Sequence, residues 1–297
     1  MDLRTMQYYL AVVREGTISA AAEALHVAQP SLSRQMKELE QELGAPLFVR
    51  GNRKITLTEE GIILRRRAEE MVQLMQMTEE EITQVKNHVS GAVRIGAGES
   101  LSFHYLSRTA SRLSREHPDI RFHITSGDTQ DLMDELTDGL IDFAVIFTEV
   151  DHDLYQSITL PVSDRFGVLM PKAHPLAVKE TVRIRDLRGY PVILSRAHAA
   201  VISGMKDFSG LDVVATYNLI YNASLLVEDG LGLAVTFDGL ISCTKSSALT
   251  FRPLVPEIPA TGKLIWKKYQ TFSPAAQLFI EHVREQVHTQ AVNNSEA

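Results

Sequence analysis

Two groups of polar residues in this 297-residue chain have types and spacings suited to binding other molecules. The first group lies in residues 17–54 and suits duplex DNA. Arginine guanidinium and glutamine amide groups can hydrogen-bond to base edges, while hydroxyl groups and cationic side chains bind phosphates. The residues expected at base edges or the adjacent sugars are Gln29, Pro30, Ser33 and Arg34, and those expected at phosphates are Thr17, Ser31, Lys37, Arg50, Arg53 and Lys54.

The second group follows apolar runs typical of strands. In open α/β sheets a ligand lies beyond the carboxyl ends of the strands, where helix N-termini offer free N–H groups. Each hydroxyl taken alone is better explained as a helix N-cap, but five strand ends directed at one cleft favour a binding site. The candidate effector-binding residues are Ser100, Leu101, Ser102, Thr129, Phe147, Thr148, Ser195, Arg196, Thr236 and Phe237.

These residues favour a small anion such as a carboxylate. Hydroxyls at helix N-termini suit that charge, and Arg196 could pair with it if the side chain turns inward. Phe147 and Phe237 could form an apolar wall that suits an aromatic or branched acid, although such residues more often belong to the core of a strand.

Catalytic and metal-binding patterns are missing from the sequence. The motifs GxSxG, GxGxxG, HExxH and GxxxxGK do not occur, and His104 and His198 lack the spacing of a metal pair. A single cysteine, Cys243, excludes an internal disulfide and a multi-cysteine metal site. Glu99 and Asp128 could form a carboxylate pair, but nothing in the sequence sets their separation. We therefore expect no metal, no cofactor and no enzymatic activity.

The DNA-contacting residues are positioned by a predicted helix-turn-helix. Thr17 or Ser19 can cap a first helix that ends near Val27, and Pro30 suits the first turn of a second helix ending before Gly44. One apolar stripe of the second helix faces the core; it consists of Leu32, Met36, Leu39 and Leu43. Two short strands, 46–49 and 55–58, flank the basic turn 50–54 and indicate a wing.

Residues 59–89 predict a long helix with a heptad seam that needs a partner helix. Its apolar steps alternate between four and three at Leu64, Ala68, Met71, Met75, Thr78, Ile82, Val85 and Val89. Packing against its own domain is the alternative, but no neighbouring segment looks free to cover it. Arg65, Arg66 and Arg67 suit a solvated face of this helix.

From residue 92 short apolar strands alternate with helices, which indicates βαβ units and a parallel sheet. Periodicity alone gives an α/β fold of one or two lobes. The expected strands are 93–97, 122–126, 143–147, 166–170, 192–194, 213–217, 233–237 and 264–269, and the expected helices are 103–116, 129–138 and 274–288.

The chain resembles the LysR-type transcriptional regulators. The resemblance rests on AAEALHVAQPSLSRQMKELEQELGAPLFVR followed by TLTEEG, and on the later segments HPDIRFHITSGDTQDLMDELTDGLIDFAVI, VLMPKAHPLA and LLVEDGLGLAVTF. It implies a multidomain chain with a winged helix-turn-helix, a linker helix and a two-lobed α/β effector domain similar to periplasmic binding proteins. Ser100 and Ser102 match the effector-contact region of the family.

The resemblance also sets expected boundaries. They are 1–58 for the DNA-binding domain, 59–90 for the linker helix and 91–297 for the effector domain, with lobe I at 91–161 and 268–290 and lobe II at 162–267. Crossovers between the lobes are expected near 160–165 and 265–270. The implied partners are promoter DNA, a small-molecule effector, a second subunit paired through the linker helix, a homotetramer, and RNA polymerase as a further candidate.

The charge composition is consistent with DNA contacts that are confined to a small part of the protein surface. The formal net charge is −7, and residues 1–58 contain seven Lys or Arg against six Asp or Glu, so phosphate contacts must come from a clustered subset. No secretory signal and no apolar run of membrane-spanning length is evident, so we expect a cytoplasmic bacterial protein without a membrane partner. A transport solute-binding protein would need an export signal, and an enzyme would need an activated group in the cleft.

Overall fold

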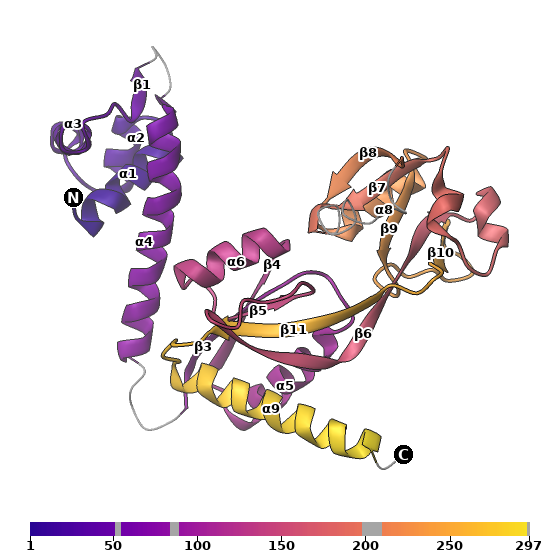
Figure 1. The fold of residues 1–297 in the computed structure, drawn as a ribbon. Helices are drawn as coiled ribbons and strands as arrows, with labels where there is room; N and C mark the ends of the chain where they lie inside the picture. The colour runs from indigo at the N-terminus through magenta and orange to yellow at the C-terminus, as the bar shows by residue number, and fades with distance from the viewer. Residues whose placement is uncertain (51–54, 84–88, 198–209, 296–297) are drawn as a thin grey trace. The chain divides into compact units, whose positions relative to one another are not determined.

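The computed structural model describes residues 1–50, 55–83, 89–197 and 210–295. They form two compact units, Met1–Lys86 and Asn87–Ala297, which are described separately below (Figure 1). Within the described ranges no helix combines the length and the apolar character needed to cross a lipid bilayer.

The first unit is a helix-turn-helix followed by a two-stranded hairpin and a long helix. Its elements are α1 (Leu3–Glu15), α2 (Ile18–Ala24), α3 (Gln29–Leu43), β1 (Phe48–Arg50), β2 (Ile55–Leu57) and α4 (Glu59–Thr83). The capping signals in the sequence are confirmed: the Thr17 hydroxyl accepts the Ala20 N–H at 3.1 Å, and Gly44 ends α3 with φ of 69°. β1 and β2 pair antiparallel, as expected for a wing.

Core packing of this unit corrects two expectations. Leu32, Met36 and Leu39 of α3 are buried, but Leu43 is 42% exposed because α3 ends there. The first half of the α4 seam does have a cover: Leu64, Ala68 and Met71 pack into the unit's own core, to which α1 also contributes. The expectation that no neighbouring segment covers the α4 seam was therefore wrong for this half of the helix.

The second unit is built on strands that run through two lobes. Its elements are β3 (Gly91–Ala97), α5 (Phe103–Glu116), β4 (Ile120–Ser126), α6 (Thr129–Asp138), β5 (Phe143–Ile146), β6 (Tyr155–Pro171), η1 (Pro175–Val178), η2 (Ile184–Leu187), β7 (Pro191–Ser195), β8 (Asp212–Tyr217), α8 (Ile220–Glu228), β9 (Leu233–Phe237), β10 (Leu249–Pro253), β11 (Pro259–Lys267) and α9 (Pro274–Ser295). The strand order is β4-β3-β5-β11-β6-β9-β7-β8, with β10 paired to β6.

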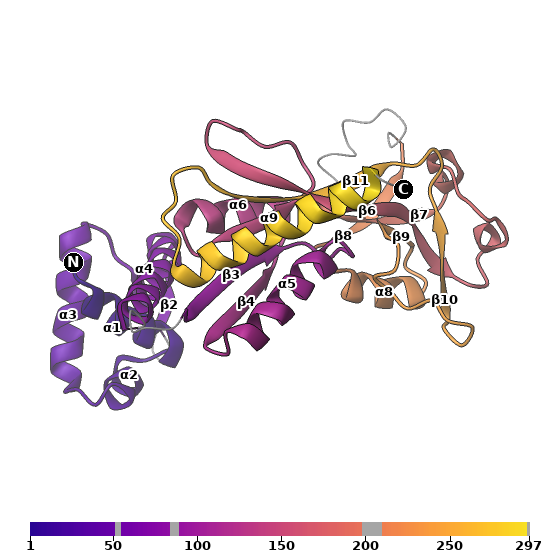
Figure 2. The same cartoon turned by 90° about the horizontal axis from the view of Figure 1, so that it is seen from below.

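Alternation along the strands produces a core on each face of the sheet. In lobe I, Phe143 and Val145 pack toward α5 and α9, whereas Ala144 and Ile146 pack toward α6. Figure 2 shows α5 and α9 side by side, in agreement with their contacts. Lobe II repeats the pattern, since Leu169 packs with α8 while its neighbours in β6 pack on the opposite face. The period of two decides which helices cover which face.

β6 and β11 are the two crossovers between the lobes. On β6, Leu160 belongs to the core of lobe I and Phe166 to that of lobe II, so the first expected crossover is confirmed. On β11 the change occurs between Ala260 and Leu264, next to a register shift between Thr261 and Lys263. The expected second crossover at 265–270, and with it the lobe II limit of 267, was several residues too late.

Several elements had no sequence prediction. The first half of β6, the helix α8, the strand β10 and the short helices η1 and η2 were all missed. The first half of β6 contains polar residues at positions where it pairs with β11, so it lacks the continuous apolar run that marks a central strand.

Gly61 provides a test of the first unit's packing. A Cβ at this position of α4 would lie 2.3 Å from the backbone carbonyl oxygen of Leu47, and the Gly61 carbonyl accepts the buried Tyr9 hydroxyl at 2.6 Å. Steric overlap should therefore outweigh the higher helix propensity of alanine. We expect Gly61→Ala to destabilise this unit by about 1–3 kcal/mol, seen as about 5- to 150-fold faster amide hydrogen exchange in residues 1–83.

The exposed Gln73 of the same helix supplies the control. Gln73→Ala should leave exchange rates in residues 1–83 nearly unchanged. Equal rates for Gly61→Ala and the wild-type protein would show that the backbone shifts away from the new methyl group without cost.

Candidate DNA-binding surface and effector pocket

The N-terminal half of α3 presents a polar, exposed surface. Gln29, Pro30, Ser31, Arg34 and Lys37 are exposed and Ser33 is half-buried, while the apolar stripe of α3 faces the core. The sequence-predicted residues of this helix thus share the side that is available to a partner.

Acidic side chains near this surface are engaged in local contacts. Glu38 pairs with Arg34 at 2.7 Å, and this hydrogen bond raises the pKa of the Arg34 guanidinium, which stays charged. The Glu40 carboxylate accepts the Leu47 N–H at 2.8 Å and so fixes the start of the wing. The Arg34–Glu38 pair is solvent-exposed and therefore weak, so Arg34 can exchange Glu38 for a nucleic acid at little cost.

The other residues predicted to contact DNA are Thr17 and three residues of the wing. Thr17 uses its hydroxyl to cap α2. Arg50 is placed only as the last residue of β1, and Arg53 and Lys54 lie outside the described residues.

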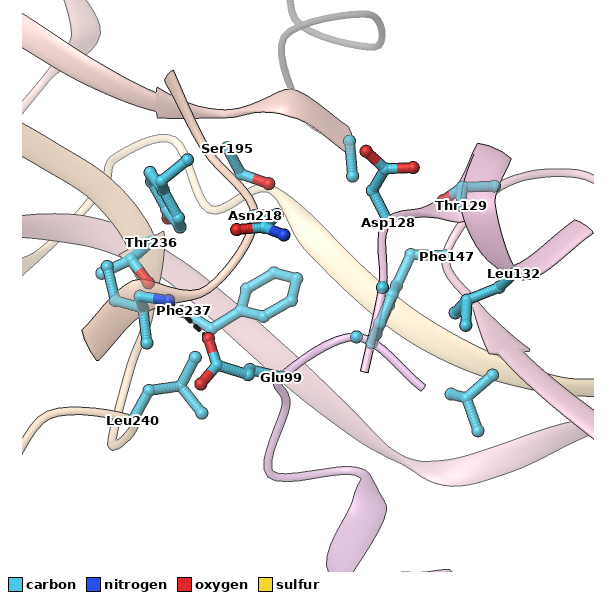
Figure 3. A pocket seen from close by; sticks show the side chains of 16 residues that line it. Glu99, Asp128, Thr129, Leu132, Phe147, Ser195, Asn218, Thr236, Phe237 and Leu240 are labelled. Atoms are coloured by element: carbon cyan, nitrogen blue, oxygen red, sulfur yellow. Dashed lines mark hydrogen bonds between the residues drawn. The ribbon is translucent and has the colours of Figure 1, made fainter. Parts of the chain in front are cut away.

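A pocket lies in the second unit between the two lobes, with an empty volume of about 520 Å³ that is partly open to solvent. Both lobes contribute residues from strand ends and helix starts (Figure 3). Its lining consists of Gly98, Glu99, Gly127, Asp128, Thr129, Leu132, Val145, Phe147, Ser195, Ala197, Tyr217, Asn218, Ile220, Thr236, Phe237 and Leu240.

Half of the predicted effector residues line this pocket. They are Thr129, Phe147, Ser195, Thr236 and Phe237. The rings of Phe147 and Phe237 lie 5.2 Å apart at 51°, and Phe147 packs against the cores of both lobes. The apolar wall expected from the sequence is therefore present.

The other five predicted effector residues are not among the lining residues. Ser102 is fully buried, and its hydroxyl bonds to the Asp164 carboxylate, which also accepts the Leu101 N–H at 2.7 Å. Ser100 is buried with no hydrogen-bond partner for its hydroxyl among the described residues, and Thr148 does not line the pocket although Phe147 does. Leu101 and Ser102 do not line the pocket because the start of α5 is bonded to β6.

Arg196 also departs from its expected position. Its guanidinium pairs with Asp128 at 2.9 Å and with Asp131 at 3.1 Å, and its side chain is half-exposed. Arg196 therefore forms an ion pair between the two lobes beside the pocket and is not a lining residue. The strand end at Asn218, just after β8, is a lining position that the strand-end rule could have found; Ile220 and Leu240 carried no such signal.

Carboxylates occupy the helix N-termini around the pocket. Asp128 accepts the N–H groups of Gln130 and Asp131 at 3.1 Å each, which caps α6. Glu99 extends from lobe I and accepts the Ile220 N–H at 2.5 Å, at the start of α8 in lobe II. The described lining therefore contains two carboxylates, Glu99 and Asp128, and no cationic side chain.

Nowhere in the described ranges do three His, Cys, Asp or Glu side chains gather as metal ligands would. Glu99 and Asp128, the carboxylate pair considered from the sequence, cap two different helices and lie on different sides of the pocket in Figure 3.

Family models match nearly the whole chain. The model for the LysR substrate binding domain matches residues 86–288, and that for bacterial regulatory helix-turn-helix proteins of the lysR family matches residues 3–62.

Similar proteins carry the names of transcriptional regulators. A probable RuBisCO transcriptional regulator of Synechocystis is 29% identical over 94% of this chain and 84% of that protein. The HTH-type transcriptional regulator BsdA of Bacillus subtilis is 32% identical over 66% of this chain and 67% of its own length.

Solved structures agree on the fold. The LysR family regulator CbnR has a TM-score of 0.75 at 19% identity, covering 97% of this chain and 99% of CbnR. Full-length BenM has a TM-score of 0.55 at 22% identity, covering 99% and 98%. On the family models and the relatives, the chain belongs to the LysR family of bacterial transcriptional regulators and is not an enzyme.

Proposed function

We propose that this LysR-type regulator binds promoter DNA through the exposed face of α3 and senses a small molecule in the pocket between the lobes of its second unit. The observation that carries the proposal is the pocket, because it is lined from both lobes, and a ligand there contacts each of them. A ligand that prefers one arrangement of the lobes shifts the population toward it. That shift would alter the spacing or bending of bound DNA.

The contacts to DNA are assigned residue by residue. Gln29, Ser33 and Arg34 read base edges, with Pro30 beside them, and Arg34 uses its guanidinium fork on guanine. Phosphates are held by Ser31 and Lys37, with Thr17 and the wing residues Arg50, Arg53 and Lys54 as further candidates. One solved neighbour is CbnR in complex with its target DNA, which supports the same role for this fold.

Subunit pairing through α4 is part of the proposal. Ile62 and Ile63 are 60% and 66% exposed on this helix and Leu74 is 37% exposed, so apolar surface remains after the unit's own core has formed. A paired helix would bury it and would place two α3 helices on successive half-sites. A tetramer, contact with RNA polymerase and a cytoplasmic location complete the proposal.

Removal of the Arg34 fork tests the DNA-binding role. We expect Arg34→Ala to weaken binding to the protein's own promoter region by about 1–3 kcal/mol, or about 5- to 150-fold, and to relax sequence preference at one position. The side chain is 81% exposed, so the fold should remain intact. Fluorescence anisotropy on promoter and scrambled duplexes across a salt series, with footprinting in the presence of small-molecule pools, gives the measurement.

Arg185→Ala serves as the charge-matched control, since Arg185 is exposed in lobe II. It should bind both duplexes as the wild-type protein does. If Arg34→Ala keeps the full sequence preference of the wild-type protein, Arg34 does not recognise a base. If footprinting shows no site protected by the wild-type protein at low salt, the proposed DNA binding is refuted.

Charges on the exposed apolar face of α4 test the pairing. We expect the double variant Ile63→Glu/Leu74→Glu to raise the dimer dissociation constant about tenfold or more, because two charges per subunit would be buried in an apolar contact. Sedimentation equilibrium measures the constant. Gln73→Glu, on an exposed polar position of α4, is the control and should dimerise normally. An unchanged constant in the double variant would locate the dimer contact elsewhere.

A further inference from the structure

The charge of the pocket bears on the chemical class of its ligand. Two helix N-termini that face the pocket, those of α6 and α8, are filled by the protein's own carboxylates, Asp128 on α6 and Glu99 on α8. Three N–H groups that a ligand carboxylate would use, those of Gln130, Asp131 and Ile220, are therefore occupied. An anionic ligand at either of these helix starts would have to displace one of these carboxylates and remain beside it.

Among the described lining residues, none is Lys, Arg or His, whereas two are acidic. Arg196 does not compensate, because Asp128 and Asp131 already hold its guanidinium beside the pocket. A second negative charge brought into this partly closed space would lose hydration without gaining an opposite charge, which is costly.

Glu99 has unused capacity to accept hydrogen bonds. Only its Oε2 atom has a hydrogen bond among the described residues, to Ile220, and a carboxylate can accept several. Tyr217 does not neutralise it: burial, with a smaller contribution from the Glu99 charge, raises the pKa of Tyr217 to about 12, and the hydroxyl donates to the Val235 carbonyl at 2.8 Å. The Glu99 carboxylate is thus the strongest free acceptor of the lining.

Aromatic and aliphatic side chains complete the surroundings of Glu99. In Figure 3 the Phe147 and Phe237 rings lie in the pocket with Glu99 on one side and Asp128 on the other. Aromatic faces attract cations and disfavour anions. Leu132, Ile220 and Leu240 add apolar surface for the body of a ligand.

We propose that the pocket binds a ligand with a cationic nitrogen, such as a primary amine, on a small apolar body, and that Glu99 accepts a charge-assisted hydrogen bond from that nitrogen. The proposal rests on the proposed function for its site and names the class of effector. It replaces the small anion that the hydroxyls at strand ends led us to expect, since those hydroxyls share the pocket with two carboxylates.

Three probes with one apolar body and different charge test the proposal: 3-methylbutylamine, 3-methylbutan-1-ol and 3-methylbutanoate. Saturation-transfer NMR titrations of the full-length protein at millimolar concentration give a dissociation constant for each. We expect the amine to bind most tightly and the acid least tightly. Glu99→Gln keeps an oxygen for the Ile220 N–H but removes the charge. It should therefore raise the dissociation constant of the amine about tenfold or more and leave that of the alcohol within about twofold of the wild-type value.

Glu180→Gln is the matched control, because Glu180 is exposed and does not line the pocket. It should reproduce the wild-type constants for all three probes. Tighter binding of the acid than of the amine would overturn the proposed charge class and leave the pocket as an effector site. Binding of the amine that Glu99→Gln does not weaken would overturn the role of Glu99. If no probe binds, both the proposed effector pocket and the proposed charge of its ligand are refuted. The DNA-binding role is tested independently by the Arg34→Ala measurement.

Discussion

The satisfaction of backbone N–H groups at helix N-termini is the constraint on which the second unit depends. The first turns of α5, α6 and α8 would each leave donors without partners, and unpaired buried donors are costly. A carboxylate lies at each start: Asp128 accepts first-turn N–H groups of α6, Glu99 accepts the Ile220 N–H of α8, and Asp164 accepts the Leu101 N–H in the turn just before α5. Asp164 and Glu99 reach these helices from positions 63 and 121 residues away in the chain, so the caps also join distant segments.

These caps give the pocket its character. A helix start without a protein carboxylate would attract an anionic ligand, as the strand-end rule assumes. Here the starts of α6 and α8 already hold carboxylates, and the rest of the described lining includes an aromatic pair and a few hydroxyl and amide groups but no cationic side chain. The Glu99 and Arg196 contacts also cross between the lobes, which means that a ligand competing for either would alter how the lobes meet.

In the first unit, a few specific contacts position α4 and hold the acidic side chains near α3. The Tyr9 hydroxyl, the Leu47 carbonyl and the absence of a side chain at Gly61 let α4 begin directly against the helix-turn-helix core. Glu38 and Glu40, which would otherwise oppose a polyanion, are held by Arg34 and by the wing backbone. An acidic chain can thereby present a local cationic and polar face on α3.

The sequence by itself determined the elements whose signals are local. Caps and periodicity placed α3 at Gln29–Leu43, α5 at Phe103–Glu116 and α6 at Thr129–Asp138, and the resemblance carried by these segments predicted the family and the two-lobed fold. Tertiary structure decided the rest, because long-range pairing has no local signature. It alone showed that Ser102 faces Asp164, that β11 changes lobes near Gly262, and that Glu99 rather than a ligand meets α8. Which group satisfies a helix N-terminus depends on what the fold brings to it, and that decided the charge of the pocket.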